Sequence, residues 1–317
     1  MSGDHVLVTG GNSGIGLECA RSLARAGWHV WIASRNREAS AEAVRLIQAD
    51  SGGAKADALS VDLGSLQSVR LLAKEIADRD IPLRAIVCNA GLQFFNGAAR
   101  YSADGFELTF AVNHLGHFLL VNLLLERLAA NAPARIAIVS SGVHDPKLRT
   151  GMPKAAISDL QTLAVTGGPR AGEFDGRLAY VNSKLCNLWF AYELVRRIES
   201  SGVTSAGRPI TVNAFDPGLV PGSGLAREYP PVLRFFWDRV LPGVARVATA
   251  VVPGINTAAK SGSALARLVL DPTLEHTTGK YFPSHTRWKE APSSDASYDA
   301  QPARALWEKS AELTGLR

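Results

Sequence analysis

Tyr180 and Lys184 lie four residues apart in the stretch LAYVNSKLCN (178–187), within a pattern that predicts a helix. On a helix this spacing places both side chains on one face. A tyrosine hydroxyl can give a proton to the alkoxide that forms when a carbonyl is reduced, but its ordinary pKa of about 10 is high for neutral pH. A neighbouring ammonium stabilises the phenolate and lowers that pKa. The pair is therefore a proton donor with its activating cation, or an ordinary helical face.

Two polar residues elsewhere in the chain suit the same reaction. Ser141 directly follows the apolar run RIAIVS (135–140), and a hydroxyl at that strand end would hold and polarise a substrate oxygen. Ser140 is expected to point the opposite way. Asn113 stands in the middle of an expected helix, where asparagine is unfavourable. It could bond a backbone carbonyl or hold a water that relays protons to Lys184.

The elements that must position these residues follow an alternating pattern. Continuously apolar runs rich in Val and Ile suit strands buried on both faces of a parallel sheet. Their alternation with helical patterns predicts an α/β fold, a doubly wound Rossmann domain with a mostly parallel sheet of about seven strands. With no internal repeat or linker, we expect one domain over 1–317. The expected strands are 5–9, 29–34, 57–62, 84–89, 135–140 and 210–215, and the expected helices 14–26, 37–50, 66–78, 103–130, 177–200 and 256–269.

Two long segments interrupt this alternation, an irregular insertion at 143–176 and a segment at 217–254. Long excursions in a compact domain are usually functional or disordered. Both follow expected strands, so both should lie at the sheet edge where open α/β folds bind ligands. The second segment is expected to cover an apolar substrate as a lid, and it is also a candidate for contact with a membrane surface. Its large apolar side chains include Tyr229, Leu233, Phe235, Phe236 and Trp237.

The stretch TGGNSGIG (9–16) joins the first expected strand to a helix. Small residues there let the backbone approach a pyrophosphate, and the helix presents its N-terminal N–H groups to the anion. The spacing is T-G-x-x-x-G-x-G rather than G-x-G-x-x-G, so the place between strand and helix is what predicts a dinucleotide site. The residues expected to contact the cofactor here are Gly10, Asn12, Ser13, Gly14, Ile15 and Gly16.

The end of the second expected strand reads Ser34-Arg35-Asn36-Arg37, about twenty residues after the glycine loop. A site for NAD places an acid here to bond the ribose 2′-hydroxyl, whereas a cation suits the 2′-phosphate of NADP. We therefore predict NADP(H) as the cofactor, chiefly through Arg35. The alternative is a pair of solvated arginines at a helix start.

Two further strand ends complete the expected cofactor site. Asp62, followed by Leu63, could accept a hydrogen bond from the adenine amino group, or cap the next helix, or do both. Small residues at the fourth strand end would let the chain pass close to the cofactor, and they are Asn89, Ala90 and Gly91.

Composition excludes several other classes of protein. The hydrophobic share of 46% and charged share of 20% are ordinary for a globular protein, and the net charge of +5 comes from scattered Lys and Arg, which argues against nucleic-acid binding. The three cysteines have no paired spacing, which favours reduced thiols and a cytoplasmic location. We expect no signal peptide before the first strand, and the most apolar run, 118–130, is interrupted by polar residues and too short to span a bilayer.

The remaining histidines and cysteines have simpler interpretations. Cys186 is expected to be a small buried residue, and His114 and His117 are expected to pack in the interior. His144 is a candidate for lining the substrate pocket because it lies close to Ser141. The seven histidines show no ligand spacing, so no metal site is predicted.

Taken together, the motifs resemble the short-chain dehydrogenase/reductase family over essentially the whole chain. They occur in the family's order: TGGNSGIG (9–16), CNAG (88–91), VNHLGHF (112–118), VSS (139–141), YVNSK (180–184) and DPGLV (216–220). Within the family the chain is most similar to the branch of retinol dehydrogenases and light-dependent protochlorophyllide oxidoreductases. Those protochlorophyllide enzymes carry a cysteine after the Pro-Gly, where this chain has Leu219.

The resemblance implies roles for individual residues. It assigns the catalytic tetrad to Asn113, Ser141, Tyr180 and Lys184, and it makes the lysine a ligand of the nicotinamide ribose as well. It also implies that Pro217, Gly218 and Val220 pack against the nicotinamide, and that the chain forms a homodimer or homotetramer.

We therefore expect an NADPH-dependent oxidoreductase that transfers a hydride between nicotinamide and a bulky apolar carbonyl or alcohol, with Tyr180 as the acid/base. One alternative is a reductase of C=C bonds like the protochlorophyllide enzymes. The other is a dinucleotide-bound sensor or scaffold without turnover, against which the intact tetrad argues.

Overall fold

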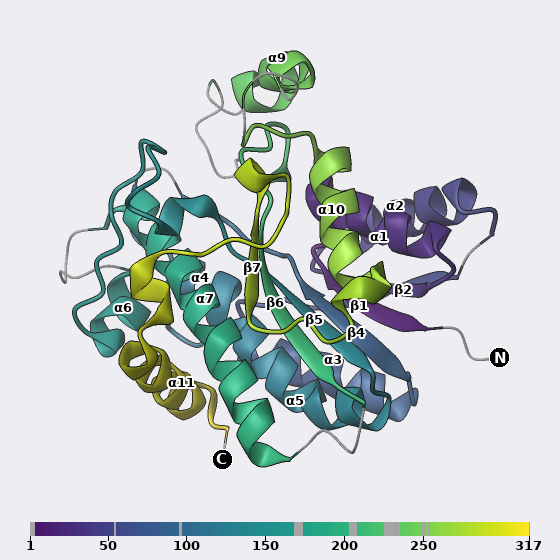
Figure 1. Ribbon diagram of the computed structural model, residues 1–317, viewed down its shortest axis with the longest axis horizontal. Coiled ribbons are helices and arrows are strands. Elements are labelled where there is room, and N and C mark those ends of the chain that lie inside the picture. Colours follow the sequence, from purple (N-terminus) through teal and green to yellow (C-terminus); the bar gives the residue numbers. More distant parts are fainter. Residues whose placement is uncertain are drawn as a thin grey trace.

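The computed structural model describes residues 4–53, 55–94, 97–167, 174–202, 208–224, 232, 235–248, 252 and 254–316. Seven parallel strands form one sheet in the order β3-β2-β1-β4-β5-β6-β7 (Figure 1). The chain order reverses between β1 and β4, which is the point where open α/β sheets bind ligands. The strands are β1 (His5–Thr9), β2 (His29–Ser34), β3 (Ala56–Ser60), β4 (Leu83–Cys88), β5 (Ala134–Val139), β6 (Ile210–Asp216) and β7 (Lys280–Pro283).

Helices cover both faces of the sheet (Figure 1). One face carries α1, α2 and α10, and the other carries α3, α5, α7 and α11. Helix α9 stands apart from both layers at the top of the view. The bounds are α1 (Gly14–Arg25), α2 (Arg37–Asp50), α3 (Leu66–Asp78), α4 (Leu108–Phe110), α5 (Gly116–Ala130), α6 (Leu160–Thr166), α7 (Gly176–Ser201), α9 (Leu241–Ala248), α10 (Ala258–Leu270) and α11 (Ala300–Thr314).

The strands are apolar on both sides because each face of the sheet packs into a separate hydrophobic layer. In β1, Val6 and Val8 pack into the layer under α1 and α10, while Leu7 between them packs into the layer under α3 and α5. Alternation along a strand sends successive side chains to opposite faces. All three are fully buried, so a continuous apolar run is what this central position requires.

The predicted doubly wound α/β fold is confirmed, with differences at several elements. The expected third strand ends at Ser60 instead of residue 62, and the helix expected from 103 begins at Leu108 and contains a π-helical turn over Ala111–Leu115. The insertion at 143–176 includes α6, and both β7 and α11 were absent from the sequence-based assignment. The division into one domain stays a prediction.

The helical stretch Leu108–Ala130 corrects the expectation that the most apolar run is too short to span a bilayer. The stretch has 23 residues, and an 18-residue window within it has a mean hydropathy of 1.5, so it meets that requirement by length and composition. However, 78% of its apolar window is buried inside the fold, as in a core helix. A spanning role therefore has weak support, and the predicted membrane-surface contact of 217–254 stays a prediction.

The close packing of α10 on α1 generates a test of the fold. A methyl group on Gly262 would lie 2.5 Å from Glu18 Cβ and 2.7 Å from the Cys19 backbone nitrogen. We expect Gly262→Ala to lower the free energy of unfolding by about 1–3 kcal/mol through overpacking, measured by urea denaturation. Gly243→Ala in α9 is the matched control, because no atom of the described residues lies within 4 Å of its added methyl group. Equal stability of the two variants would contradict this packing.

Candidate active site

A cavity of about 810 Å³ opens at the carboxyl ends of the strands and gathers nearly every predicted site residue. It runs from the glycine loop after β1 to the ends of β5, β6 and α7. Ser141, Tyr180 and Lys184 line it. So do all predicted cofactor contacts, namely Gly10, Asn12, Ser13, Gly14, Ile15, Gly16, Arg35, Asp62, Leu63, Asn89, Ala90, Gly91, Pro217, Gly218 and Val220. Their roles stay predictions, because lining the cavity shows where these residues lie and not what they do.

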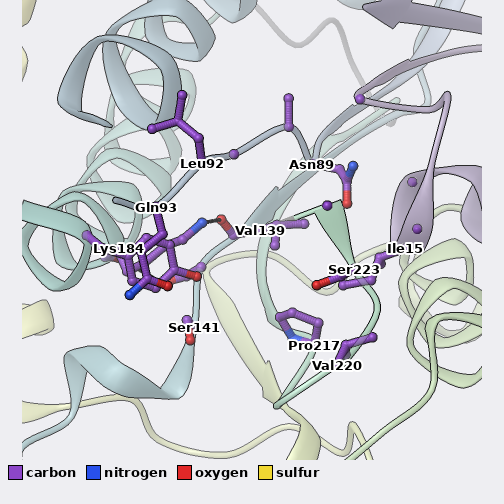
Figure 2. Close-up of a pocket in the computed structure, with 18 of the residues that line it drawn as sticks. Ile15, Asn89, Leu92, Gln93, Val139, Ser141, Lys184, Pro217, Val220 and Ser223 are labelled. Carbon is purple, nitrogen blue, oxygen red and sulfur yellow. Dashed lines mark hydrogen bonds between the residues drawn. The ribbon is translucent and has the colours of Figure 1, made fainter. Parts of the chain in front are cut away.

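The two ends of the cavity are built from different parts of the chain. Figure 2 shows the side chains of Lys184, Gln93 and Ser141 on one side, across from Ile15, Pro217 and Val220. The first side lies by β5 and α7, and the second by α1 and the segment after β6.

In the glycine loop the backbone at Gly16 lies unusually close to the backbone at Gly10. A methyl group on Gly16 would lie 2.3 Å from the Gly10 carbonyl oxygen and 2.5 Å from Asn89 Nδ2, so only glycine fits. Gly10 itself has φ +64°, in the left-handed region that glycine favours. Helix α1 has no acid in its first turn, and the Ser13 side chain makes no capping hydrogen bond. The N–H groups and the positive end of the helix are thus available to an anion in the cavity.

Arg35 and Asp62 lie at the ends of β2 and β3, as the sequence predicted, and both line the cavity. Arg35 is exposed, and it has no ion-pair partner within the part of the chain that the structure describes. Asp62 Oδ1 accepts a hydrogen bond from the Gly64 backbone at 3.0 Å, in the turn before α3. The predicted helix-cap role is wrong, because Ser65 is the N-cap of α3 and its hydroxyl accepts from the Ser68 N–H. The other Asp62 oxygen makes no hydrogen bond to a described residue, and the contact with adenine stays a prediction.

Lys184 is the most constrained ionisable residue of the site. Its side chain is 3% exposed, and its ammonium donates to the Val139 carbonyl at 3.2 Å. Asn187 Nδ2 donates to the same carbonyl at 3.0 Å, and Ser140 Oγ donates to the Lys184 carbonyl at 2.8 Å. Burial lowers the pKa of Lys184 to about 8, against a smaller opposing effect of the Asp216 carboxylate. These bonds fasten α7 to the end of β5.

Tyr180 and Ser141 complete the reactive end of the cavity. The Lys184 ammonium lies 5.3 Å from the centre of the Tyr180 ring, and that ring is 7% exposed. Ser141 is half-buried, and its hydroxyl makes no hydrogen bond to any residue among those described. The hydroxyl is thus available to a ligand. Its neighbour Ser140 points toward α7 instead, as the sequence predicted.

Asn113 differs from the other three predicted catalytic residues because it does not line the cavity. It is fully buried, accepts a hydrogen bond from the Leu92 N–H at 2.9 Å and donates to the Leu92 carbonyl at 3.0 Å. It also donates to Ser183 Oγ at 3.0 Å, and that hydroxyl donates to the Tyr180 carbonyl. The expected bond to a backbone carbonyl is therefore present, and Asn113 ties the β4 loop to α7. The water relay stays a prediction.

Burial explains the other titratable side chains near the site. His114 and His117 are buried, and burial lowers their pKa values to about 3 and about 4. Burial raises the pKa of each cysteine thiol, including Cys186, so these cysteines are unreactive core residues. His144 does not line the cavity, contrary to the expectation from its position next to Ser141.

Several lining residues were missed by reasoning from the sequence. They include Leu92, Gln93, Leu148, Arg149, Met152, Ser223 and His285, all in loops after strands, where no motif marks them. Among the expected lid residues, Trp237 lines the cavity and donates to the Ser223 carbonyl at 3.1 Å. Phe235 and Phe236 are exposed, and Tyr229 and Leu233 lie outside the described residues.

Comparisons with known proteins agree with this geometry. A family model described as short chain dehydrogenase matches residues 4–152. The chain is 35% identical to WW domain-containing oxidoreductase of Homo sapiens, over 99% of this chain and 68% of that protein. It is also 35% identical to Protochlorophyllide reductase B, chloroplastic, of Hordeum vulgare, over 98% of this chain and 79% of that protein.

Solved structures share the fold at low sequence identity. An actinorhodin polyketide ketoreductase with NADPH has a TM-score of 0.62 and 22% identity, covering 89% of this chain and 95% of its own. A blue fluorescent protein from a metagenomic library in complex with NADPH has a TM-score of 0.62 and 20% identity, covering 89% of this chain and 96% of its own.

The burial of Lys184 predicts a specific dependence of stability on pH. In the folded protein its pKa is about 8, against 10.5 for the ordinary side chain, so between these values the unfolded chain binds more protons. The free energy of unfolding that Lys184 contributes therefore rises with pH in this window. We expect the stability of Lys184→Met relative to wild type to be highest below pH 8 and to fall above it, by on the order of 3 kcal/mol in total.

Urea denaturation of both proteins at pH values on either side of 8 measures this difference. Lys74→Met is the control for the substitution itself, because that side chain is 68% exposed on α3. A stability difference between Lys184→Met and wild type that does not change over this pH range would contradict the burial of the ammonium.

Proposed function

The chain belongs to the short-chain dehydrogenase/reductase family, and on that premise we propose that it is an NADPH-dependent oxidoreductase acting on a bulky apolar carbonyl or the corresponding alcohol. The observation that carries the proposal is the meeting of Ser141, Tyr180 and the buried Lys184 at one end of a cavity whose other end is a glycine loop.

The donor set fits a dinucleotide with a 2′-phosphate. The glycine loop, together with the uncapped N-terminus of α1, suits a pyrophosphate. Arg35 lines the cavity without a carboxylate partner among the described residues, and a phosphate would supply the missing charge. Two structural neighbours are described with NADPH, which supports the same choice. Asp62, Asn89 and Pro217 would line the remainder of the bound cofactor.

The protein's own residues would then handle the oxygen and its proton. When bound, the nicotinamide supplies or accepts the hydride. Ser141 would donate its free hydroxyl to the substrate oxygen and hold it, and Tyr180 would give that oxygen its proton in the direction of reduction. The positive charge of Lys184 would stabilise the phenolate that Tyr180 leaves behind. Asn113 would act by holding the loop of Leu92 and helix α7 in place.

The substrate part of the cavity supports an apolar compound. Apolar side chains line it from four separate segments, and they include Leu92, Val143, Leu148, Met152, Leu219 and Trp237. A pocket of this kind binds by burial of apolar surface, with a few polar groups to orient the ligand. The Ser141 and Tyr180 hydroxyls are those groups in this proposal.

A second candidate reaction is reduction of a C=C bond, favoured by the 35% identity to Protochlorophyllide reductase B. The cofactor and the proton donor would stay the same, and the acceptor of the hydride would change. Loss of the protochlorophyllide absorption band on illumination with enzyme and NADPH would support it, and no loss would remove it.

Removal of the Arg35 guanidinium should separate the two nicotinamide cofactors. We expect Arg35→Ala to weaken NADPH binding by about 10- to 100-fold, the value of a charge-assisted contact to phosphate, and to leave NADH binding almost unchanged. Fluorescence titration of both cofactors measures this. Arg37→Ala is the control, since Arg37 is also exposed but does not line the cavity. Equal losses for NADPH and NADH would refute the role of Arg35.

Removal of the Tyr180 hydroxyl should stop the reaction without emptying the site. With NADPH and a panel of decanal, naphthaldehyde and acetophenone, we expect Tyr180→Phe to lower kcat by at least about 100-fold, the usual contribution of a general acid. NADPH affinity should stay within about 3-fold of wild type, because the ring remains. Unchanged turnover of every accepted carbonyl would show that Tyr180 is not the acid.

A further inference from the structure

His144 makes two hydrogen bonds that join the reactive loop to the C-terminal part of the chain. It is 2% exposed, and its Nδ1 lies 2.6 Å from the Ser141 carbonyl oxygen. Its Nε2 lies 3.2 Å from the backbone nitrogen of Ser294, 150 residues further along the chain. The ring also packs edge-on against Tyr281 of β7, with ring centres 5.4 Å apart.

These contacts fix the protonation of the ring. The Ser294 backbone N–H can only donate, so Nε2 must accept and carries no proton. Nδ1 therefore carries the proton and donates it to the Ser141 carbonyl. Burial lowers the pKa of His144, which agrees with a neutral ring.

The Ser141 side chain depends on this backbone contact. Its hydroxyl has no hydrogen-bond partner among the described residues, so the Cα–Cβ direction that the backbone sets decides which part of the cavity the hydroxyl can reach. Its carbonyl accepts from His144 twice, from Nδ1 at 2.6 Å and from the backbone N–H at 3.3 Å. Two donors on one carbonyl hold the peptide plane after Ser141 and thereby constrain the Cα–Cβ direction of Ser141.

The segment that carries Ser294, residues 291–298, is itself fastened to the catalytic helix α7. Trp189 Nε1 donates to the Ala296 carbonyl at 2.8 Å, and the Tyr192 hydroxyl lies 2.8 Å from Ser293 Oγ. Both aromatic residues lie on α7, within about three and a half turns of Tyr180. At its start the segment pairs with β7 through the Ala291 N–H and the Tyr281 carbonyl.

We propose that His144 is a positioning residue through which the segment 291–298 sets the Ser141 hydroxyl relative to Tyr180 on α7. The same C-terminal segment holds the helix that carries the acid and, through the imidazole, the loop that carries the oxygen-holding hydroxyl. The effect on catalysis rests on the proposed function, whereas the fixing of the Ser141 loop by His144 does not.

Variants of His144 separate its two hydrogen bonds. In His144→Asn the side-chain amide nitrogen takes the place of Nδ1, so the bond to the Ser141 carbonyl is kept and the bond to Ser294 is lost. In His144→Gln the longer side chain places its amide oxygen near Nε2, so the bond from the Ser294 N–H is kept and the bond to Ser141 is lost. His144→Ala loses both bonds. Lys147→Ala is the matched control, because Lys147 also joins this loop to the C-terminal segment, by an exposed ion pair with Asp295 at 2.8 Å.

Two measurements are made on each variant. Hydrogen–deuterium exchange of the peptide covering residues 141–145 reports the hold on the loop. Steady-state kinetics with NADPH and decanal, naphthaldehyde or acetophenone reports its effect on turnover. We expect His144→Ala and His144→Gln to exchange about ten-fold faster and to lose about ten-fold in kcat with little change in KM for NADPH. His144→Asn keeps the donor to Ser141 but loses the bond to Ser294, so we expect its exchange to be about three-fold faster than wild type, between wild type and His144→Ala. Lys147→Ala should differ from wild type by less than about two-fold.

The outcomes separate this proposal from the function. Wild-type exchange in His144→Ala, or wild-type exchange in both His144→Gln and His144→Asn, overturns the positioning role, and the second comparison applies even where the Ala variant does not fold. Wild-type exchange in His144→Asn alone overturns the part of the segment 291–298, because that variant loses the bond to Ser294. Faster exchange with unchanged kcat overturns the link to catalysis. If the wild type reduces none of the carbonyls, the proposed function fails, while the exchange measurement still decides whether His144 holds the loop.

Discussion

The burial of one ammonium group is the constraint on which the reactive end of this molecule depends. Lys184 is 3% exposed, and such a cation is costly to bury unless polar groups compensate it. The Val139 carbonyl accepts its hydrogen bond, and the buried Asp216 carboxylate contributes a favourable charge. Because Val139 ends β5 and Lys184 belongs to α7, this hydrogen bond requires α7 to keep a fixed position against the end of β5. The same position brings Ser141, two residues after Val139, toward Tyr180.

Two glycines let the backbone pass close to the buried polar side chains at the reactive end of the cavity. A methyl group on Gly91 would lie 3.4 Å from Asn113 Oδ1 and 3.8 Å from the Lys184 ammonium, and one on Gly142 would lie 3.2 Å from Asp216 Oδ2. Asn113 then holds the Leu92 backbone and Ser183 together from behind the cavity wall. The cavity is thus shaped by buried polar contacts among loops.

Local spacing predicted those features that depend on neighbours in sequence. The pairing of Tyr180 with Lys184 follows from one helical turn, and the glycine loop follows from its place after β1. The position of Asn113 behind the cavity wall could not be predicted, because the π-helical turn at Ala111–Leu115 changes which way side chains point, and no residue pattern marks such a turn. The bond between His144 and Ser294 joins residues 150 positions apart, and β7, only four residues long, shows no periodicity.

The most direct test of the proposed hydride transfer is the position of deuterium in the product after reaction with NADPH deuterated on the transferable hydrogen of nicotinamide. Deuterium is expected on the carbon that carries the new hydroxyl, with the hydroxyl proton coming from solvent through Tyr180. Deuterium on a carbon of a former C=C bond would support the alternative reduction instead. Product without deuterium would contradict the proposal that Ser141, Tyr180 and Lys184 serve a hydride transfer.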